Sequence, residues 1–170
     1  MPAESFRILG IDPGIALVGY GILEIKNQNN LQNPKLLECG VISTPAGQNL
    51  GLRLKTIRED LKALITKFKP DYGAVELIYF AKNAKTAIMV AQARGVIMEA
   101  LTSSNLRQIA EFTPTHLKQV LFGHGKADKK QIQMIVSQVL GLPNIIKPDD
   151  AADATAIGLA LLRSGLLTSF

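Results

Sequence analysis

Short apolar runs separated by turn residues fill the first 43 positions of the chain, a pattern typical of strands. Phe6 to Asp12 is the first run, and Val18 to Ile25 is a second that returns after the Pro13-Gly14 turn. Leu36 to Ser43 is a third, beyond an Asn- and Gln-rich segment, 27–33, that we expect to be a surface connection. The close spacing of these runs predicts three antiparallel strands.

A helical period replaces the strand pattern after Pro45. The apolar positions that share one helical face are Leu50, Leu54, Ile57, Leu61, Leu64, Ile65 and Phe68. Asn49 is the expected N-cap and Pro70 ends the helix. Tyr72 to Leu77 then reads as a strand, so that helix and strand form part of a βαβ unit.

The rest of the chain alternates in the same way. We expect an Ala-rich helix from about Asn83 to Ser103, a strand over Gln108 to Phe112, a helix capped by Thr113, and two further helices, from Lys126 to Val139 and from Asp149 to Ser164. This order predicts an α/β fold in which helices flank a five-stranded mixed sheet, with its later strands parallel. Residues 1–170 are expected to form a single domain.

Charge and composition indicate which kinds of partner and cellular location to expect for the protein. The net charge of +5 favours a polyanionic partner, because basic surface attracts phosphate. No run approaches the ~18 apolar residues of a membrane span, and the N-terminus has no apolar signal core, so we expect a cytoplasmic protein without a membrane partner. Cys39 is the only cysteine and cannot form an intrachain disulfide.

Four acidic residues stand at positions that structure alone does not explain: Asp12, Glu76, Asp150 and Asp153. Asp12 and Glu76 lie at or near the ends of apolar strands, and the other two open the last helix. Converging carboxylates repel one another unless a cation lies between them. Mg²⁺ prefers such oxygen ligands, and two ions about 3.5–4 Å apart can promote cleavage of a phosphodiester.

Each acid also has a structural interpretation. Asp12 could cap the Pro13-Gly14 turn, and acids at the start of the last helix could stabilise its N-terminus. Asp149 is assigned that helix-terminal role, although it shares a helical face with Asp153 at i, i+4 as Asp150 does at i, i+3. Glu76 is harder to explain, because a charge in a strand buried on both faces needs a partner or a metal.

Motifs along almost the whole chain resemble the RuvC family of bacterial Holliday junction resolvases, which have a ribonuclease H-like fold. The matching segments are Gly10-Ile-Asp-Pro-Gly14, Lys69-Pro-Asp-Tyr72 with Val75-Glu76, Ala81-Lys-Asn-Ala84, Gln92-Ala-Arg-Gly95 and Asp150-Ala-Ala-Asp-Ala154. The resemblance implies that Asp12, Glu76, Asp150 and Asp153 are catalytic and hold two Mg²⁺ ions in each subunit, with Mn²⁺ able to substitute. The family's spacing favours Asp150 over Asp149.

The resemblance also assigns DNA contacts. Tyr79 and Phe80 would stack on unpaired bases, although family members often have Phe at the first position, and one of the two could instead belong to the core. The basic residues expected to contact phosphate are Lys82, Arg94, Lys118, Lys126, Lys129 and Lys130. Solvated surface is the alternative for any single lysine. His124 could support the site but is not expected to be a ligand.

The function implied is that of a homodimeric, Mg²⁺-dependent endonuclease in recombination and repair. It would nick two opposed strands of four-way junction DNA symmetrically, leave 5′-phosphate and 3′-hydroxyl ends, and cooperate with the branch-migration helicase complex of RuvA and RuvB. A ribosomal-RNA-processing nuclease shares the first motif, and an actin-like nucleotide-binding module has a related turn but needs a second such domain. A junction-binding scaffold that does not cut is the third alternative.

Overall fold

The computed structural model describes residues 5–26, 31, 33–77 and 84–167. The strands in these residues are β1 (Phe6–Asp12), β2 (Leu17–Ile25), β3 (Lys35–Ser43), β4 (Tyr72–Glu76) and β5 (Gln108–Phe112). The helices are α1 (Leu50–Phe68), α2 (Ala84–Thr102), α3 (Pro114–Phe122), α4 (Lys129–Val139) and α5 (Asp149–Arg163). None of the helices in this described part of the chain is long and apolar enough to cross a bilayer.

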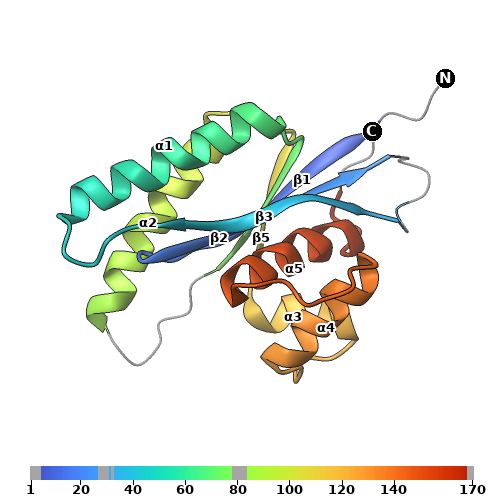
Figure 1. Ribbon diagram of the computed structural model, residues 1–170. Coiled ribbons are helices and arrows are strands. Elements are labelled where there is room, and N and C mark those ends of the chain that lie inside the picture. Colours follow the sequence, from blue (N-terminus) through green and yellow to red (C-terminus); the bar gives the residue numbers. More distant parts are fainter. Residues whose placement is uncertain (1–4, 27–30, 32, 78–83, 168–170) are drawn as a thin grey trace.

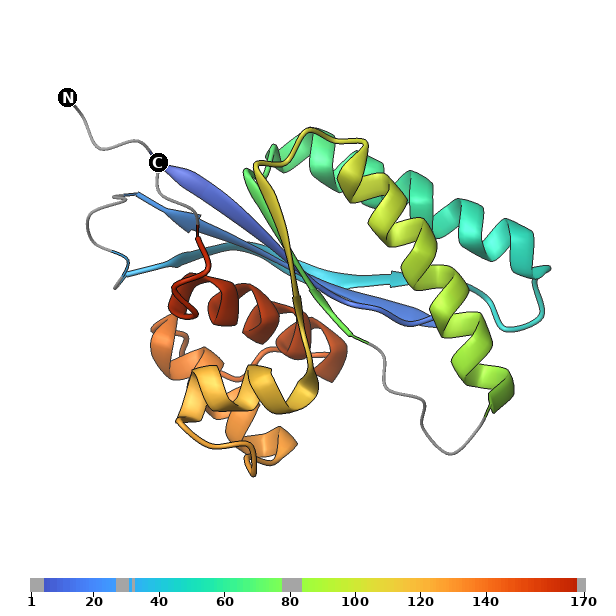
Figure 2. The same ribbon diagram turned by 180° about the vertical axis from the view of Figure 1, so that it is seen from behind.

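The strands form one mixed sheet in the order β3-β2-β1-β4-β5. β1, β2 and β3 pair antiparallel, whereas β4 lies parallel to both β1 and β5. Helices α1 and α2 cover one face of the twisted sheet, and α3, α4 and α5 cover the other (Figures 1 and 2). The expected five-stranded mixed sheet with three antiparallel strands at the start is therefore confirmed.

Alternating side chains of the central strands divide between two hydrophobic cores. On β1, Ile8 packs in the core that includes α5, and Leu9 packs in the core that includes α1 and α2. On β4, Ala74 and Val75 divide in the same way. Successive residues of a strand face opposite sides of a sheet, so even-numbered positions of β1 and β4 face α5. This parity decides where the acidic residues at the strand ends point.

Helix α5 lies directly on β1 and β2, because glycines of these strands leave room for its backbone. A Cβ atom on Gly10 would lie 2.1 Å from the carbonyl oxygen of Ala154, and one on Gly19 would lie 2.0 Å from that of Asp150. Real side chains cannot occupy such positions. Both faces of this Ala-rich helix are buried in consequence, since almost every residue from Ala151 to Leu162 is inaccessible to solvent.

The start of α4 differs from expectation. The sequence pattern places the start of this helix at Lys126, whereas the helix begins at Lys129. Asp128 is its N-cap: the Asp128 carboxylate accepts from the backbone N–H of Gln131, and the Gln131 side chain accepts from the backbone N–H of Asp128, both at 2.8 Å. This reciprocal pair satisfies two free N–H groups and fixes the first turn. The caps expected at Asn49 and Thr113 are confirmed.

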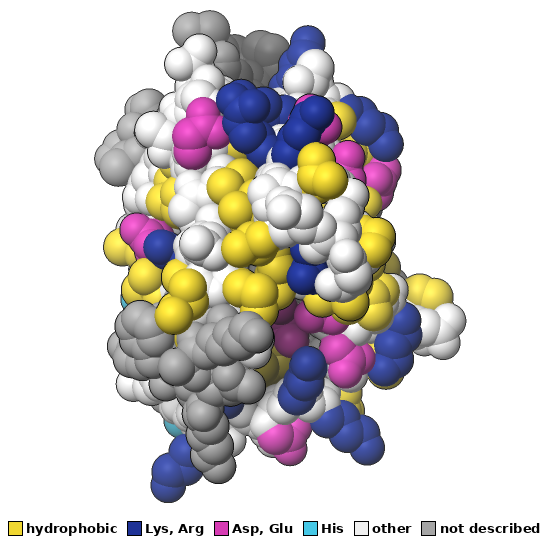
Figure 3. All heavy atoms as spheres, turned by 90° about the vertical axis from the view of Figure 1, so that its left-hand side faces the viewer, with side chains coloured by type: hydrophobic (Ala, Val, Ile, Leu, Met, Phe, Trp, Pro, Cys, Tyr) yellow, Lys and Arg dark blue, Asp and Glu magenta, His cyan; other side chains and the backbone are white. Residues whose placement is uncertain are grey.

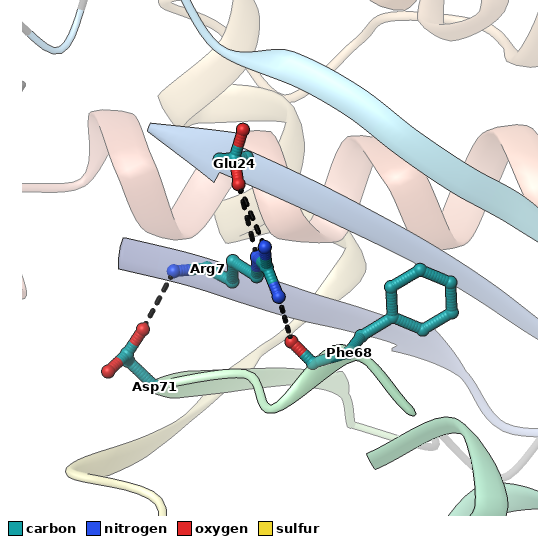
Figure 4. Close-up of polar contacts among 4 residues, drawn as sticks. All are labelled: Arg7, Glu24, Phe68 and Asp71. Carbon is teal, nitrogen blue, oxygen red and sulfur yellow. Dashed lines mark hydrogen bonds and ion pairs between the residues drawn. The ribbon is translucent and has the colours of Figure 1, made fainter. Parts of the chain in front are cut away.

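A polar network joins four segments at the end of the sheet where β1 begins (Figure 4). The guanidinium group of Arg7 donates to Glu24 at 3.0 and 3.2 Å and to the carbonyl oxygen of Phe68 at 2.7 Å. The backbone N–H of Arg7 donates to the Asp71 carboxylate at 2.9 Å. The end of α1 and the start of β4 are thereby fixed to β1 and β2.

Candidate active site

Asp12 and Glu76 end two neighbouring parallel strands and face the same side of the sheet. Ile11 pairs with Val75 in the register of β1 and β4, so the residue that follows each lies beside the other. Both are even-numbered positions and point toward α5. Their side chains are half-buried. The sheet therefore brings together two carboxylates that are 64 positions apart in the chain.

Helix α5 begins over the same end of the sheet. Gly19 pairs with Asp12 across β1 and β2, and the backbone carbonyl of Asp150 lies over Gly19. Asp150 and Asp153 occupy the first and second turns of this helix, at a separation that places both on one face. The four acidic residues predicted from the sequence thus lie around one end of β1 and β4. Their roles as catalytic ligands stay a prediction.

Burial and mutual repulsion weaken the acidity of this cluster. Burial, together with the charges of Glu76, Asp153 and Asp150, raises the pKa of Asp12 to about 8. Burial and the charge of Asp153 raise the pKa of Glu76 to about 7. The pKa of Asp153 is raised by burial, against the opposing charge of Lys129. A cation bound among these groups would favour their ionised forms.

Lys129, the first residue of α4, is a basic side chain in ion-pair contact with the cluster. Its Nζ lies 3.3 Å from Oδ2 of Asp153 and 3.8 Å from Oδ2 of Asp149. Burial would lower the pKa of Lys129, but the charge of Asp153, its hydrogen bond with Lys129 and the neighbouring acids outweigh that effect and raise it. This ammonium group supplies part of the positive charge that the carboxylates need.

A small cleft opens beside the cluster. Its volume is about 150 Å³, and Glu76, Asp153, Lys118 and Lys129 line it together with apolar residues of α3 and α4. Figure 3 views the face toward which β1 ends in Figure 1 and shows acidic side chains recessed in a hollow, with basic side chains beside them. The charge of Lys118 lowers the pKa of Glu76 against the larger effect of burial. The cleft therefore combines oxygen ligands with groups that attract phosphate.

The residues present fit a hard divalent cation in their chemistry. All four acids offer carboxylate oxygens, which Mg²⁺ and Mn²⁺ accept as ligands. Among the described residues, however, no three His, Cys, Asp or Glu side chains are close enough together to enclose an ion. Asp153 is paired with Lys129 at 3.3 Å. Rotation of the side chains is needed for them to close around a cation.

Asp149 lies in the first turn of α5, where an acid stabilises the helix N-terminus as expected, but it is not the N-cap residue. The N-cap of α5 is Pro148, and no side chain caps this end with a hydrogen bond. Oδ1 of Asp149 instead accepts from Nε2 of Gln133 at 2.7 Å and from Nζ of Lys147 at 3.0 Å. These bonds, that from Lys147 first, lower the pKa of Asp149. Sequence reasoning missed Gln133, although a glutamine on the buried face of an amphipathic helix is a usable signal.

The predicted DNA contacts divide into three groups. Tyr79, Phe80 and Lys82 lie outside the described residues. Arg94 on α2 forms an ion pair with Glu111 on β5, and its side chain is only 22% exposed, so its charge is already partnered within the subunit.

The remaining predicted contacts lie near the cleft. Lys118 is half-buried in its wall, and Lys126, Lys129 and Lys130 are exposed at the start of α4. His124 faces its own loop: its Nδ1 accepts from the backbone N–H of Lys126 at 3.3 Å. The exposed lysines therefore extend the basic surface outward from the acidic cluster.

Comparison with known proteins agrees with this architecture. Residues 8–161 match the family model described as crossover junction endodeoxyribonuclease RuvC. The chain is 43% identical over 164 residues to the enzyme of that name from Syntrophomonas wolfei, covering 96% of this chain and 92% of the relative. It is 45% identical over 158 residues to the one from Caldicellulosiruptor saccharolyticus, covering 93% of each.

A solved structure of similar shape supports the same assignment. The RuvC of T. thermophilus, in a complex with a Holliday junction substrate, superposes with a TM-score of 0.85 at 29% identity, covering 94% of each chain. Sequence similarity and backbone similarity thus extend over nearly the same length. The chain belongs to the RuvC family of crossover junction endodeoxyribonucleases.

Proposed function

We propose that this protein resolves Holliday junctions by cutting two opposed DNA strands in a metal-dependent reaction. The observation that carries the proposal is the group of acids around one end of β1 and β4. Burial and mutual repulsion raise the pKa values of Asp12, Glu76 and Asp153 there, which is the electrostatic condition that a cation relieves. Membership of the RuvC family supports this activity.

Asp12, Glu76, Asp150 and Asp153 would hold Mg²⁺, with two ions in each subunit during the reaction. When bound, the metal would supply Lewis-acid stabilisation and an activated water for hydrolysis of the phosphodiester. Mg²⁺ suits the site because it takes oxygen ligands and completes its coordination with water and phosphate. Mn²⁺ has the same preference for oxygen and is expected to replace it.

The basic side chains of the cleft would bind and orient the substrate. Lys118 and Lys129 line the cleft together with Glu76 and Asp153, and there an ammonium group can contact a phosphate oxygen. Lys126 and Lys130 are exposed next to them and would follow the DNA backbone away from the cut. The internal ion pair of Arg94 with Glu111 makes Arg94 the weakest candidate for a phosphate contact.

Recognition of the four-way junction would depend on further parts of the enzyme. Tyr79 and Phe80 are proposed to stack on unpaired bases at the junction, and Lys82 to contact phosphate beside them. A homodimer would place two active sites on a two-fold symmetric substrate, so that paired cuts release two duplexes. Cuts that leave 5′-phosphate and 3′-hydroxyl ends would let a ligase seal them.

The same reaction defines the setting in which the protein would act. We place it in the cytoplasm, where bacterial DNA recombination and repair take place. RuvA and RuvB, which move the junction, are its proposed partners. One domain, residues 1–170, would carry both the catalytic acids and the surface that binds DNA.

A cleavage assay on matched substrates tests the proposal. Mobile and immobile four-way junctions, the corresponding duplexes and RNA hairpins would be incubated with Mg²⁺, Ca²⁺ or EDTA. The proposal predicts paired nicks in junction DNA with Mg²⁺ only. Asp12→Asn should abolish these nicks while the variant still binds the junction in Ca²⁺.

The other outcomes point to the competing functions. Cleavage of the RNA hairpin in preference to the junction would indicate an RNA-processing nuclease. Binding of the junction without cleavage under every metal condition would indicate a scaffold. Loss of both binding and cleavage in Asp12→Asn would argue against a metal role for that carboxylate.

A further inference from the structure

Lys129 lies between two carboxylates that come from successive turns of α5. Its Nζ is 3.3 Å from Oδ2 of Asp153 and 3.8 Å from Oδ2 of Asp149. Only one of these acids belongs to the cluster proposed to hold the metal. The side chain of Lys129 is 56% exposed, so it can move between the two without disturbing the core.

Asp149 is fixed in place by groups that do not take part in the cluster. Nε2 of Gln133 and Nζ of Lys147 both donate to Oδ1, at 2.7 and 3.0 Å. Gln133 is only 6% exposed and stands one helical turn after Lys129 on α4. With Oδ1 occupied by two donors, Oδ2 is the oxygen that faces Lys129. Asp149 is therefore an acceptor with two donors of its own beside an exposed ammonium group.

Metal binding would change which acid Lys129 prefers. A divalent cation on Asp153 would neutralise that carboxylate and repel the nearby ammonium group. Asp149 would keep its negative charge and its position, because Gln133 and Lys147 continue to hold it. Lys129 would then have an anion close to the cleft and would not need to turn outward into solvent.

We propose that Asp149 is a positioning residue, which holds Lys129 at the cleft after metal has displaced it from Asp153, so that Lys129 can reach the substrate phosphate. The inference rests on the proposed function, since it assigns Asp153 to the metal. Asp149 is neither one of the four proposed metal ligands nor a proposed phosphate contact. Its proposed effect on the reaction is exerted through Lys129.

A double-mutant cycle tests this dependence. The variants are Asp149→Asn, Lys129→Met and the two combined, and the measurement is the single-turnover rate of junction cleavage in Mg²⁺ at saturating protein. Asp149→Asn should lower the rate about two- to fivefold, the effect of losing one exposed ion pair. In the Lys129→Met background the same substitution should have almost no effect. Asp149→Glu keeps the charge and should restore most of the rate.

Metal binding without DNA provides a readout that does not depend on activity. The midpoint of thermal unfolding would be followed while Mg²⁺ is titrated into metal-free protein. In Asp149→Asn, Lys129 keeps its ion pair with Asp153 and competes better with the metal, so half of the stabilisation should need at least about twice the Mg²⁺. Without Lys129 the shift in Mg²⁺ concentration should be clearly smaller.

Two controls separate this mechanism from a general loss of structure or of function. Lys55→Met removes an exposed positive charge on α1, where Lys55 pairs with Glu59 away from the cleft, and its cleavage rate should stay within about twofold. Equal effects of Asp149→Asn with and without Lys129, in both measurements, would overturn the proposal. If the unsubstituted enzyme cut no junction, the proposed function would fail, whereas the Mg²⁺ titrations would still decide whether the two residues are coupled.

Discussion

The Asp12→Asn variant should be more stable than the unsubstituted protein when no metal is bound. Burial, together with the charges of Glu76, Asp153 and Asp150, raises the pKa of Asp12 from 3.8 to about 8. The unfolded chain releases this proton near pH 4, and the folded protein retains it up to about pH 8. Stability is therefore lost as the pH rises between these values. Asparagine has the same shape and cannot ionise, so it avoids that loss.

The size of the effect follows from the pKa. Each tenfold change in an ionisation equilibrium corresponds to about 1.4 kcal/mol, so ionisation of Asp12 opposes folding by at most about 5 kcal/mol at pH 8. Rotation of the carboxylate toward water relieves part of this, and we expect a gain of about 2–3 kcal/mol. In a protein of this length that gain raises the midpoint of thermal unfolding by about 5–10 °C.

Circular dichroism during heating in EDTA, at pH 5 and pH 8, measures the gain. It should be roughly a third as large at pH 5 as at pH 8, because the unfolded chain then gains much less from ionisation. Glu76→Gln should gain less than Asp12→Asn, since the pKa of Glu76 is raised only from 4.5 to about 7. Asp60→Asn, at an exposed position on α1, is the matched control and should change little at either pH.

The dependence on Mg²⁺ tests the same electrostatic effect. Added Mg²⁺ should reduce the advantage of Asp12→Asn, because a bound cation stabilises the ionised carboxylate of the unsubstituted protein. If Asp12→Asn is no more stable than the unsubstituted protein at pH 8 in EDTA, ionisation of Asp12 does not oppose folding, and the electrostatic explanation is refuted. It is also refuted if the gain is independent of pH.

Three further predictions concern packing, stacking and charge. Gly19→Ala should destabilise the fold by about 1–3 kcal/mol and slow cleavage, since its Cβ would meet the carbonyl oxygen of Asp150 and push α5 from the site. Gly95→Ala, where a Cβ meets nothing within 4 Å, is the matched control and should be neutral or stabilising in denaturant unfolding. Replacing Tyr79 and Phe80 by alanine should reduce junction cleavage more than duplex affinity, as parallel rate and binding assays would show. Junction binding should weaken steeply with added salt in a fluorescence titration, because basic surface releases counterions.

Each of these has a clear contrary outcome. Equal stability and equal cleavage in Gly19→Ala and Gly95→Ala would mean that α5 is not held against β2 as described. Unchanged junction cleavage without Tyr79 and Phe80 would remove the stacking assignment. A binding constant that hardly responds to salt would make the basic surface incidental.

Local patterns along the chain were enough to locate most elements. The apolar positions of α1 repeat at helical spacing, and Asn49 caps it as expected. Alternation and turn residues also placed the strands within a few residues of their observed ends. The start of α4 was misplaced because Lys126 and Lys129 both follow turn residues, and only the reciprocal bonds between Asp128 and Gln131 select the later start. Residue propensities along the chain predict that a helix is present, whereas the residue at which the helix begins depends on particular hydrogen bonds.

For the acidic residues, too, the sequence predicted some features and missed others. Their positions at strand ends and at a helix start were visible in the sequence, because unpaired charges next to apolar runs need an explanation. The hydrogen bond from Gln133 to Asp149 was not visible, since Gln133 belongs to α4, whereas Lys147 is only two positions away from Asp149. The sequence suggested a helix-terminal role for Asp149 because an acid in the first turn of a helix stabilises its N-terminus.

The sequence alone determined that this chain is an α/β protein with motifs of the RuvC family, since apolar spacing, turn residues and motifs are properties of neighbouring positions. Only the tertiary structure decided that Asp12 and Glu76 face the same side of the sheet, that α5 lies on Gly19, and that Lys129 stands between two aspartates. Register, close backbone packing and the pairing of charges depend on segments far apart in the chain. Their energies arise only when folding brings those segments into contact.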